Sequence, residues 1–216
     1  MSIAEKLTAV AENQQKVYDA GVAAGQMQGG YDQGYTAGQQ AEYDRFWDAY
    51  QNNGAETNYY QKFSQNGWND ITFNPKYPII CKGGSTNANS VFGRLAATRI
   101  PVPVTIEGIK ADSTFFYATH LKTITKLVLN GVTGFASCFT GCTKLENITI
   151  EGSIDVNFNI SATAVLTNES VQSIIDHLKD LTGATTQTLT FHADVGAKLT
   201  DEQKAFITAK NWKLVY

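Results

Sequence analysis

The sequence predicts an α+β protein, in which a long N-terminal helix precedes a short, irregular solenoid of strand-bearing repeats with a helical C-terminal cap. Three observations predict this order. Apolar residues follow a helical heptad pattern over residues 1–50, short β-type segments recur after residue 70, and two amphipathic helical segments lie near the C-terminus. We therefore expect a helical coiled-coil stalk at 1–50, a connector at 51–70 and a repeat domain with its cap at 71–216.

The N-terminal segment has the residue spacing of a coiled coil. Residues at alternating steps of four and three form a row that is aliphatic at its start and contains tyrosine and glycine further on. The predicted oligomerisation residues are Ile3, Leu7, Val10, Val17, Tyr31 and Tyr35. Each glycine inside a helix costs about 1 kcal/mol relative to alanine, so an isolated helix is not expected. A homotrimeric stalk is favoured, and a flexible Gly-rich tether is the alternative.

A short aromatic helix is predicted to follow the stalk over residues 41–50. One face of it carries Tyr43, Phe46, Trp47 and Tyr50, which are spaced by three and four residues. This face is a predicted docking interface, either onto the chain's own repeat domain or onto a partner. Asn53 and Gly54 then end the helix and begin the connector.

Three segments in the middle of the repeat domain share a strand followed by glycine. They are residues 104–108, 127–131 and 148–152, with offsets of 23 and 21 residues. These periods lie within the range of leucine-rich repeats, in which each unit contributes one strand to a parallel stack. Because a single coil cannot bury its own apolar face, stacking is required, and we expect Cys142 and Leu145 to point inward.

The C-terminal segment is predicted to contain two helices separated by a strand. Thr167 begins the first, and Gly183 ends it. Thr200 and Gln203 form the capping box of the second, which runs to about Lys210. With strands at 189–191 and 213–215, this end is interpreted as an enlarged repeat and a cap that covers the open edge of the solenoid.

The composition excludes two classes of partner. The net charge is −3 and there is no basic run, so the chain lacks the dense Lys/Arg face that neutralises nucleic-acid phosphates. It also has no basic amphipathic helix and no apolar run approaching about 18 residues, which excludes membrane insertion. Residues 1–6 contain no apolar secretion signal, so we expect synthesis in a bacterial cytoplasm.

No catalytic residue, metal site or cofactor is predicted, and the chain is not expected to be an enzyme. Cys138 and Cys142 could supply two metal ligands, but a structural zinc site needs four, so buried thiols are favoured. Glu107, Asp112 and Glu151 are the carboxylates near strand ends that could be paired for glycoside hydrolysis, and solvated turn residues are the favoured interpretation.

Residues 139–150, F-T-G-C-T-K-L-E-N-I-T-I, resemble the BspA-type leucine-rich repeat, whose unit reads roughly F-x-x-C-x-x-L-x-x-I-x-I. Residues 116–129 look like a degenerate second copy, with His120 near the place of the cysteine. The C-terminal segment is similar to the ends of such proteins from gut Firmicutes and their phages. Residues 3–7, 42–48 and 68–77 look like the stalk and linker of versions encoded in prophage tail regions. The resemblance implies recognition of a protein or glycan surface without a cofactor.

The sequence and this resemblance together favour a non-enzymatic phage tail-associated adhesin, a receptor-binding protein located on the virion tail. Its expected partners are further copies of itself, phage tail or baseplate proteins, and a host-surface protein or glycan. A purely structural virion component, in which the repeat domain is only a spacer, is one alternative. A bacterial cell-surface leucine-rich-repeat interaction protein is the other.

Overall fold

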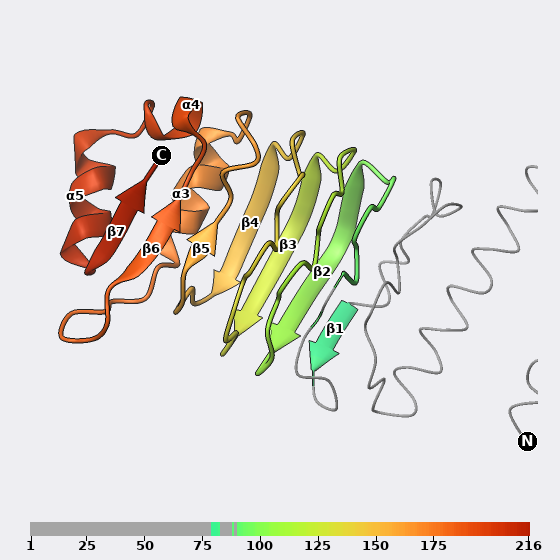
Figure 1. Cartoon of the computed structure of the whole chain (residues 1–216), viewed down its shortest axis with the longest axis horizontal. Helices are drawn as coiled ribbons and strands as arrows, with labels where there is room; N and C mark the ends of the chain where they lie inside the picture. Colours follow the sequence, from blue (N-terminus) through green and yellow to red (C-terminus); the bar gives the residue numbers. More distant parts are fainter. Residues whose placement is uncertain (1–78, 83–87, 89) are drawn as a thin grey trace, which may run out of the picture. The chain divides into compact units, whose positions relative to one another are not determined.

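The computed structural model describes residues 79–82, 88 and 90–216 (Figure 1). Every described residue belongs to one compact unit of the chain. The predicted stalk and the predicted connector lie outside the described residues, as does the strand expected at 71–73, so these remain predictions.

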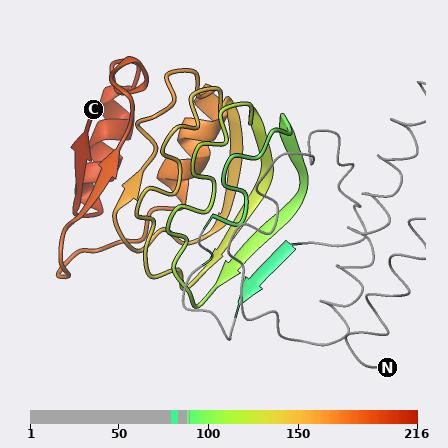
Figure 2. The same ribbon diagram turned by 45° about the vertical axis from the view of Figure 1, so that its right-hand side comes forward.

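Four strands form a parallel sheet whose spatial order follows the chain (Figure 1). They are β1 (Ile79–Lys82), β2 (Arg99–Glu107), β3 (Thr123–Asn130) and β4 (Asn147–Gly152). Because parallel neighbours cannot be joined by a tight hairpin, the chain returns after each strand to the end of the sheet at which the next strand begins. Figure 2 shows these return connections as a layer over one face of the sheet.

The inward face of this sheet is built from aliphatic rows that run across the strands. Ile79, Val104, Leu127 and Ile150 lie in register, and each is at most 2% exposed. Predicted strands at 104–106, 127–129 and 148–150, and their parallel pairing, are therefore confirmed. The inward orientation expected for Cys142 and Leu145 is confirmed as well, since both are 0% exposed.

Stacked phenylalanines hold the return connections together. The rings of Phe92 and Phe115 stack with centroids 5.2 Å apart, and those of Phe115 and Phe139 stack at 5.4 Å. Phe139 also contacts Phe158 at 5.5 Å, which extends the row towards the C-terminal strands. Between the same connections the Phe115 N–H donates to the Cys138 carbonyl at 3.0 Å. The predicted second repeat copy at 116–129 thus starts one residue late, because Phe115 is the residue that stacks on Phe139.

A second parallel sheet follows, with short helices on its connections (Figure 1). Its strands, in spatial order, are β5 (Phe158–Asn159), β6 (Gln187–Thr190) and β7 (Trp212–Val215). The described helices are α3 (Asn168–Asp176), α4 (Ala193–Gly196) and α5 (Asp201–Ala209). None of them is long and apolar enough to cross a bilayer.

The predicted starts of the two longer helices are confirmed. The Thr167 side chain accepts from the Ser170 N–H at the start of α3, and Thr200 forms a capping box with Gln203 at the start of α5. The predicted end of α3 at Gly183 is wrong, since the helix ends at Asp176 with His177 as its C-cap. Leu178 then forms an isolated parallel bridge with Ile154, so the apolar residues beyond the helix are buried by strand-like contacts.

The predicted fold class, α+β with a long N-terminal helix, a leucine-rich-repeat solenoid and a helical cap, is wrong for the described residues. Both sheets are entirely parallel, the helices span nine residues or fewer, and the segment predicted to be a helical cap contains a sheet of its own. The physical reason is the size of the helices. A nine-residue helix buries only a narrow apolar stripe, so each needs neighbouring strands to complete a core. The expected long helix itself falls outside the described residues.

The open side of β4 is covered by side chains of α3 instead of by another strand. Ser170 Oγ accepts from the Ile148 N–H at 2.9 Å, and Ser173 Oγ accepts from the Ile150 N–H at 2.8 Å. Backbone donors on a sheet edge otherwise offer a template for pairing with other chains. Two serines one helical turn apart therefore satisfy β4 and block the addition of a strand there.

We expect Ser170→Ala to lower the free energy of unfolding by about 1–3 kcal/mol, because the buried Ile148 N–H loses its acceptor. Ser173→Ala is the matched variant and should cost less, since Ser173 is only half-buried and water can replace its hydroxyl. Urea unfolding followed by circular dichroism measures both. Equal stability of the two variants would show that the free energy contributed by each serine hydrogen bond does not depend on the burial of the serine.

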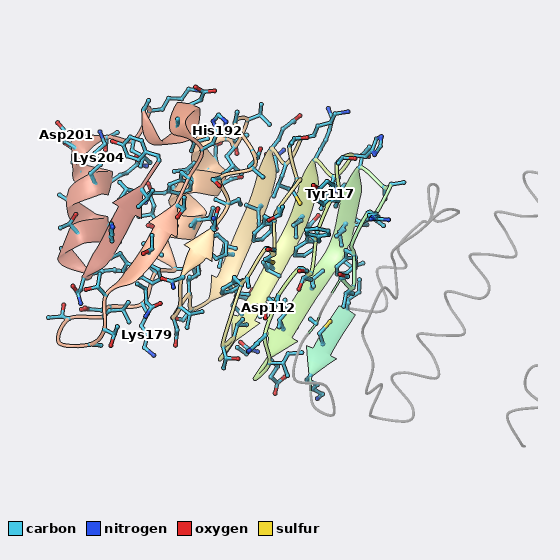
Figure 3. All side chains as sticks on the ribbon, in the orientation of Figure 1. Asp112, Tyr117, Lys179, His192, Asp201 and Lys204 are labelled. Carbon is cyan, nitrogen blue, oxygen red and sulfur yellow. The ribbon has the colours of Figure 1, made fainter. Side chains whose placement is uncertain are left out.

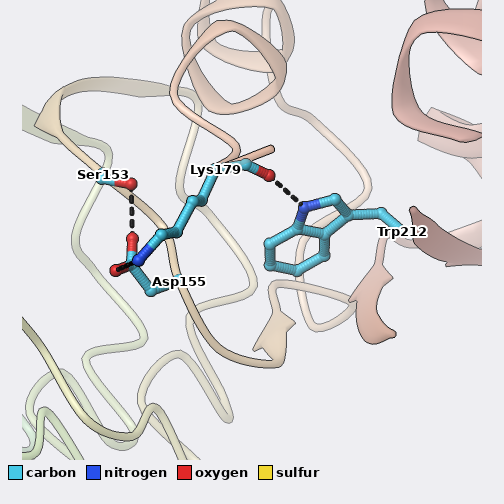
Figure 4. Close-up of polar contacts among 4 residues, drawn as sticks. All are labelled: Ser153, Asp155, Lys179 and Trp212. Carbon is cyan, nitrogen blue, oxygen red and sulfur yellow. Dashed lines mark hydrogen bonds and ion pairs between the residues drawn. The ribbon is translucent and has the colours of Figure 1, made fainter. Parts of the chain in front are cut away.

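Polar contacts join the segment after β4 to the segment after α3 (Figure 4). The Ser153 hydroxyl donates to the Asp155 carboxylate, and Lys179 Nζ lies 2.7 Å from its other oxygen. Burial by itself raises the pKa of Asp155, but hydrogen bonds from Lys179 and Ser153 and the lysine charge outweigh it and lower that pKa. The pair therefore contributes stability above an ordinary aspartate pKa of about 4, and this is lost as the pH falls through the lowered value. The Trp212 indole N–H donates to the Lys179 carbonyl at 2.8 Å, which ties β7 to the same place.

Candidate recognition surface

The return connections of the first sheet contain residues with left-handed backbone conformation at matching positions. One row is formed by Ser90, Ser113 and Ser137, and a second by Arg94, Tyr117 and Gly141, with φ angles between 53° and 81°. Glycine adopts this conformation without steric cost, whereas other residues are strained by about 1–2 kcal/mol. Arg94 and Tyr117 therefore carry large side chains at positions whose backbone conformation favours glycine.

Tyr117 is the outlier with the largest exposed side chain. It is 50% exposed at a φ of 56°. Its ring packs edge-on against Phe116, with centroids 4.6 Å apart and planes at 64°. The ring also lies against Gly141, where an added Cβ would be 3.1 Å from the Tyr117 Cγ. Contacts on two sides thus fix the orientation of a half-exposed aromatic ring.

Arg94 occupies the equivalent position in the preceding coil. Its N–H donates to the Phe116 carbonyl at 2.7 Å, which places it beside the backbone next to Tyr117. Neighbouring parallel strands lie about 4.8 Å apart, so the side chains of Arg94 and Tyr117 start at a comparable separation. Arg94 is exposed. An exposed guanidinium and an exposed aromatic ring therefore lie on adjacent coils.

Exposed cationic side chains lie near the end of the coils where β2, β3 and β4 begin, the end towards which Figure 3 labels Tyr117. Besides Arg94, the exposed residues Arg99, Lys122 and Lys144 lie just before or at the starts of the strands. The acidic residues near this end are Glu146, which is paired with Lys122 at 3.3 Å, and the exposed Glu169 in the first turn of α3. In a chain with a net charge of −3, this end is suited to an anionic or polar ligand.

The site residues predicted from the sequence all lie outside the described residues. They are Ile3, Leu7, Val10, Val17, Tyr31 and Tyr35 for oligomerisation, and Tyr43, Phe46, Trp47 and Tyr50 for docking. Sequence reasoning missed Tyr117. The repeat offset of 23 residues aligns Arg94 with Tyr117, but the match between Tyr117 and Gly141 follows from the 24-residue spacing of Phe115 and Phe139, which the structure shows.

The cysteines weighed for metal binding are buried thiols. Burial raises the pKa of Cys81 and of Cys142 to about 12, and it also raises the pKa of Cys138. Cys142 Sγ donates to the Phe115 carbonyl at 3.0 Å, so this thiol is engaged inside the stack. Groups of three or more His, Cys, Asp or Glu side chains suited to a metal ion are not found within the described part of the chain. These thiols are arranged for packing.

The carboxylates weighed for glycoside hydrolysis are held apart by other contacts. Glu151 pairs with Lys126 at 2.7 Å on the outer face of the sheet. Asp112 accepts from the Ala136 N–H at 2.8 Å and so orders the turn of the next coil. Glu107 lies two strands away from Glu151, a separation of about 10 Å at the usual strand spacing. The structure does not bring these three side chains into one site.

Searches for similar proteins yielded no matching family model, curated protein or solved structure.

Proposed function

We propose that this chain is a non-enzymatic, phage tail-associated adhesin whose stacked coils recognise a host-surface protein or glycan. The observation that carries the proposal is the exposed ring of Tyr117, which its neighbours hold in one orientation. A fixed aromatic side chain supplies contact area with little loss of conformational entropy on binding, which is why such residues dominate recognition surfaces. The resemblance of residues 3–7, 42–48 and 68–77 to the stalk and linker of versions encoded in prophage tail regions supports the placement on a tail.

Two features of the described residues support a binding role over a catalytic one. The thiols of Cys138 and Cys142 are buried with raised pKa values, so neither is poised as a nucleophile. The carboxylates Glu107, Asp112 and Glu151 are not brought into one site, so they do not form the pair that glycoside hydrolysis requires. In this proposal the coils display a surface and perform no chemistry. Residues 1–50 would form the homotrimeric stalk, with tail or baseplate proteins as the attachment point.

Cell binding tests the proposal directly. Fluorescently labelled full-length chain is mixed with a panel of gut Firmicutes strains, and cell-bound fluorescence is measured by flow cytometry. We expect saturable binding to some strains, reduced about tenfold in the variant Tyr117→Gly. Ser137→Gly is the control, because it relieves the same backbone conformation in the next coil without removing an aromatic ring.

An absence of saturable binding to every strain would contradict the proposed function and favour a structural spacer. Equal loss of binding in Tyr117→Gly and Ser137→Gly would show that backbone changes anywhere in the coils disturb the domain. Tyr117 would then not be the contact residue.

A further inference from the structure

We infer that the surface formed by Arg94 and Tyr117 binds an acidic glycan, with a sugar ring against the exposed part of the Tyr117 ring and a carboxylate of the glycan on the Arg94 guanidinium. This inference rests on the proposed function, because it names the ligand class of the same surface. Each half of the contact follows from a separate observation.

The first observation is that the fold does not need an aromatic side chain at position 117. The equivalent position of the next coil is Gly141, and the connection there has the same hydrogen-bonded form. A tyrosine at this position carries backbone strain that glycine would not. Phe116 packs against the ring at an angle of 64°, and Tyr117 remains 50% exposed, so the exposed part is available for a ligand.

The exposed part of the Tyr117 ring suits the apolar side of a sugar. The π-face of an aromatic ring carries partial negative charge and attracts the polarised C–H groups of a pyranose, as it attracts the edge of another ring. Tyr117 is held in place by Phe116 and Gly141, so stacking costs little further ordering. A flat saccharide unit therefore suits this position better as a ligand than the long flexible side chain of a partner protein does.

The second observation is the charge beside the ring. Arg94 presents a planar fork of N–H donors, which matches a carboxylate in bidentate geometry. Arg99, Lys122 and Lys144 surround the same end of the coils. A neutral glycan would use only Tyr117, whereas a uronic acid residue would use the ring and the guanidinium together. The cationic setting thus selects an acidic glycan.

A single-stranded nucleic acid also combines negative charge with flat rings, but the surface favours it less. Such ligands are bound by a series of aromatic platforms along a basic groove. Tyr117 is the only exposed phenylalanine, tyrosine or tryptophan on the described return connections of the first sheet, and the exposed His120 follows three residues later. One aromatic ring beside one arginine fits one sugar unit, and tighter binding of a nucleic acid than of an acidic glycan would contradict the inference.

The test is isothermal titration of the full-length chain with trigalacturonate, with neutral galactotriose and with an oligothymidylate of three nucleotides. We expect trigalacturonate to bind at least about tenfold more tightly than either of the other probes. Tyr117→Gly should weaken trigalacturonate binding by about tenfold or more, in line with the loss of one stacked ring. Arg94→Gln should remove the preference for the acidic over the neutral trisaccharide.

Two controls keep the result interpretable. Ser137→Gly should leave all three affinities unchanged, since Ser137 is a left-handed residue that belongs to the other row and carries no aromatic ring. Melting temperatures should show that Tyr117→Gly is at least as stable as the parent, because glycine relieves the strain at this position. A loss of binding in a stable variant is therefore a loss of contact.

Several outcomes would overturn the inference. These are no binding of trigalacturonate, equal binding of the neutral trisaccharide, tighter binding of the oligothymidylate, or unchanged affinity in Tyr117→Gly and Arg94→Gln. If cells bind the parent chain and not Tyr117→Gly while trigalacturonate does not bind, the acidic-glycan inference fails and a host protein becomes the ligand. If cells do not bind at all, the proposed adhesin function fails as well.

Discussion

Phe139→Ala is expected to lower the free energy of unfolding by about 3–5 kcal/mol, the range for an aromatic side chain removed from a packed core. Phe139 is 1% exposed and contacts Phe115 on one side and Phe158 on the other. Its removal leaves a cavity between the two sheets, which the neighbouring rings cannot fill because stacking fixes their orientation. The loss should therefore lie towards the upper end of that range.

Phe206→Ala is the matched control for this substitution. Phe206 lies on α5, is 44% exposed, and has the Lys210 ammonium 4.4 Å from its ring centroid. Its removal should cost no more than about 1 kcal/mol, the size of an exposed cation–π contact. Guanidinium unfolding followed by tryptophan fluorescence measures both variants. If Phe139→Ala costs no more than Phe206→Ala, the phenylalanine row is not the core that links the coils.

Gly152→Ala should be the most damaging glycine substitution in the first sheet. Gly152 has a φ of 89°, and a Cβ added there would lie 2.1 Å from the Leu129 carbonyl oxygen. The carbonyl belongs to the backbone of the neighbouring strand, so relief requires that β3 and β4 move apart. We expect a loss of about 1–3 kcal/mol from this displacement, in addition to the backbone strain.

Gly131→Ala separates the steric clash with Leu129 from the backbone strain of a positive φ. Gly131 has a φ of 64°, but an added Cβ would meet nothing within 4 Å. Its substitution should cost about 1–2 kcal/mol from backbone strain alone. The difference between the melting temperatures of the two variants reports the close approach at Leu129. Identical melting temperatures would rule out a steric contribution at Gly152.

The strands and helix starts could be predicted because their signals lie in residues close together in the chain. The spacing of Ile148 and Ile150 marks one strand, and Thr200 with Gln203 marks the beginning of α5. The repeat offset also predicted parallel pairing, because units of equal length align the same side chains in successive coils. The strands expected at 189–191 and 213–215 correspond to β6 and β7, but their pairing with β5 into a second sheet was missed, because β5 spans only two residues and is too short for any periodicity.

The candidate recognition surface could not be predicted in the same way. The exposure of Tyr117 depends on the left-handed conformation that the turn imposes and on the contact with Gly141 in the next coil. The local sequence around Phe116 and Tyr117 reads equally well as two core aromatics. Pairing of the Ser170 hydroxyl with β4 is similarly invisible, since it joins residues 22 positions apart.

The sequence by itself determined which residues are inward-facing, where the repeats stack and where α3 and α5 begin. These features follow from periodicity and capping, which act over a few residues. Only the tertiary structure decided the pairing of β5, β6 and β7 into a second parallel sheet, the covering of β4 by Ser170 and Ser173, and the exposure of Tyr117 beside Arg94. The physical reason is that each of these depends on contacts between successive coils, which form only when the coils have stacked.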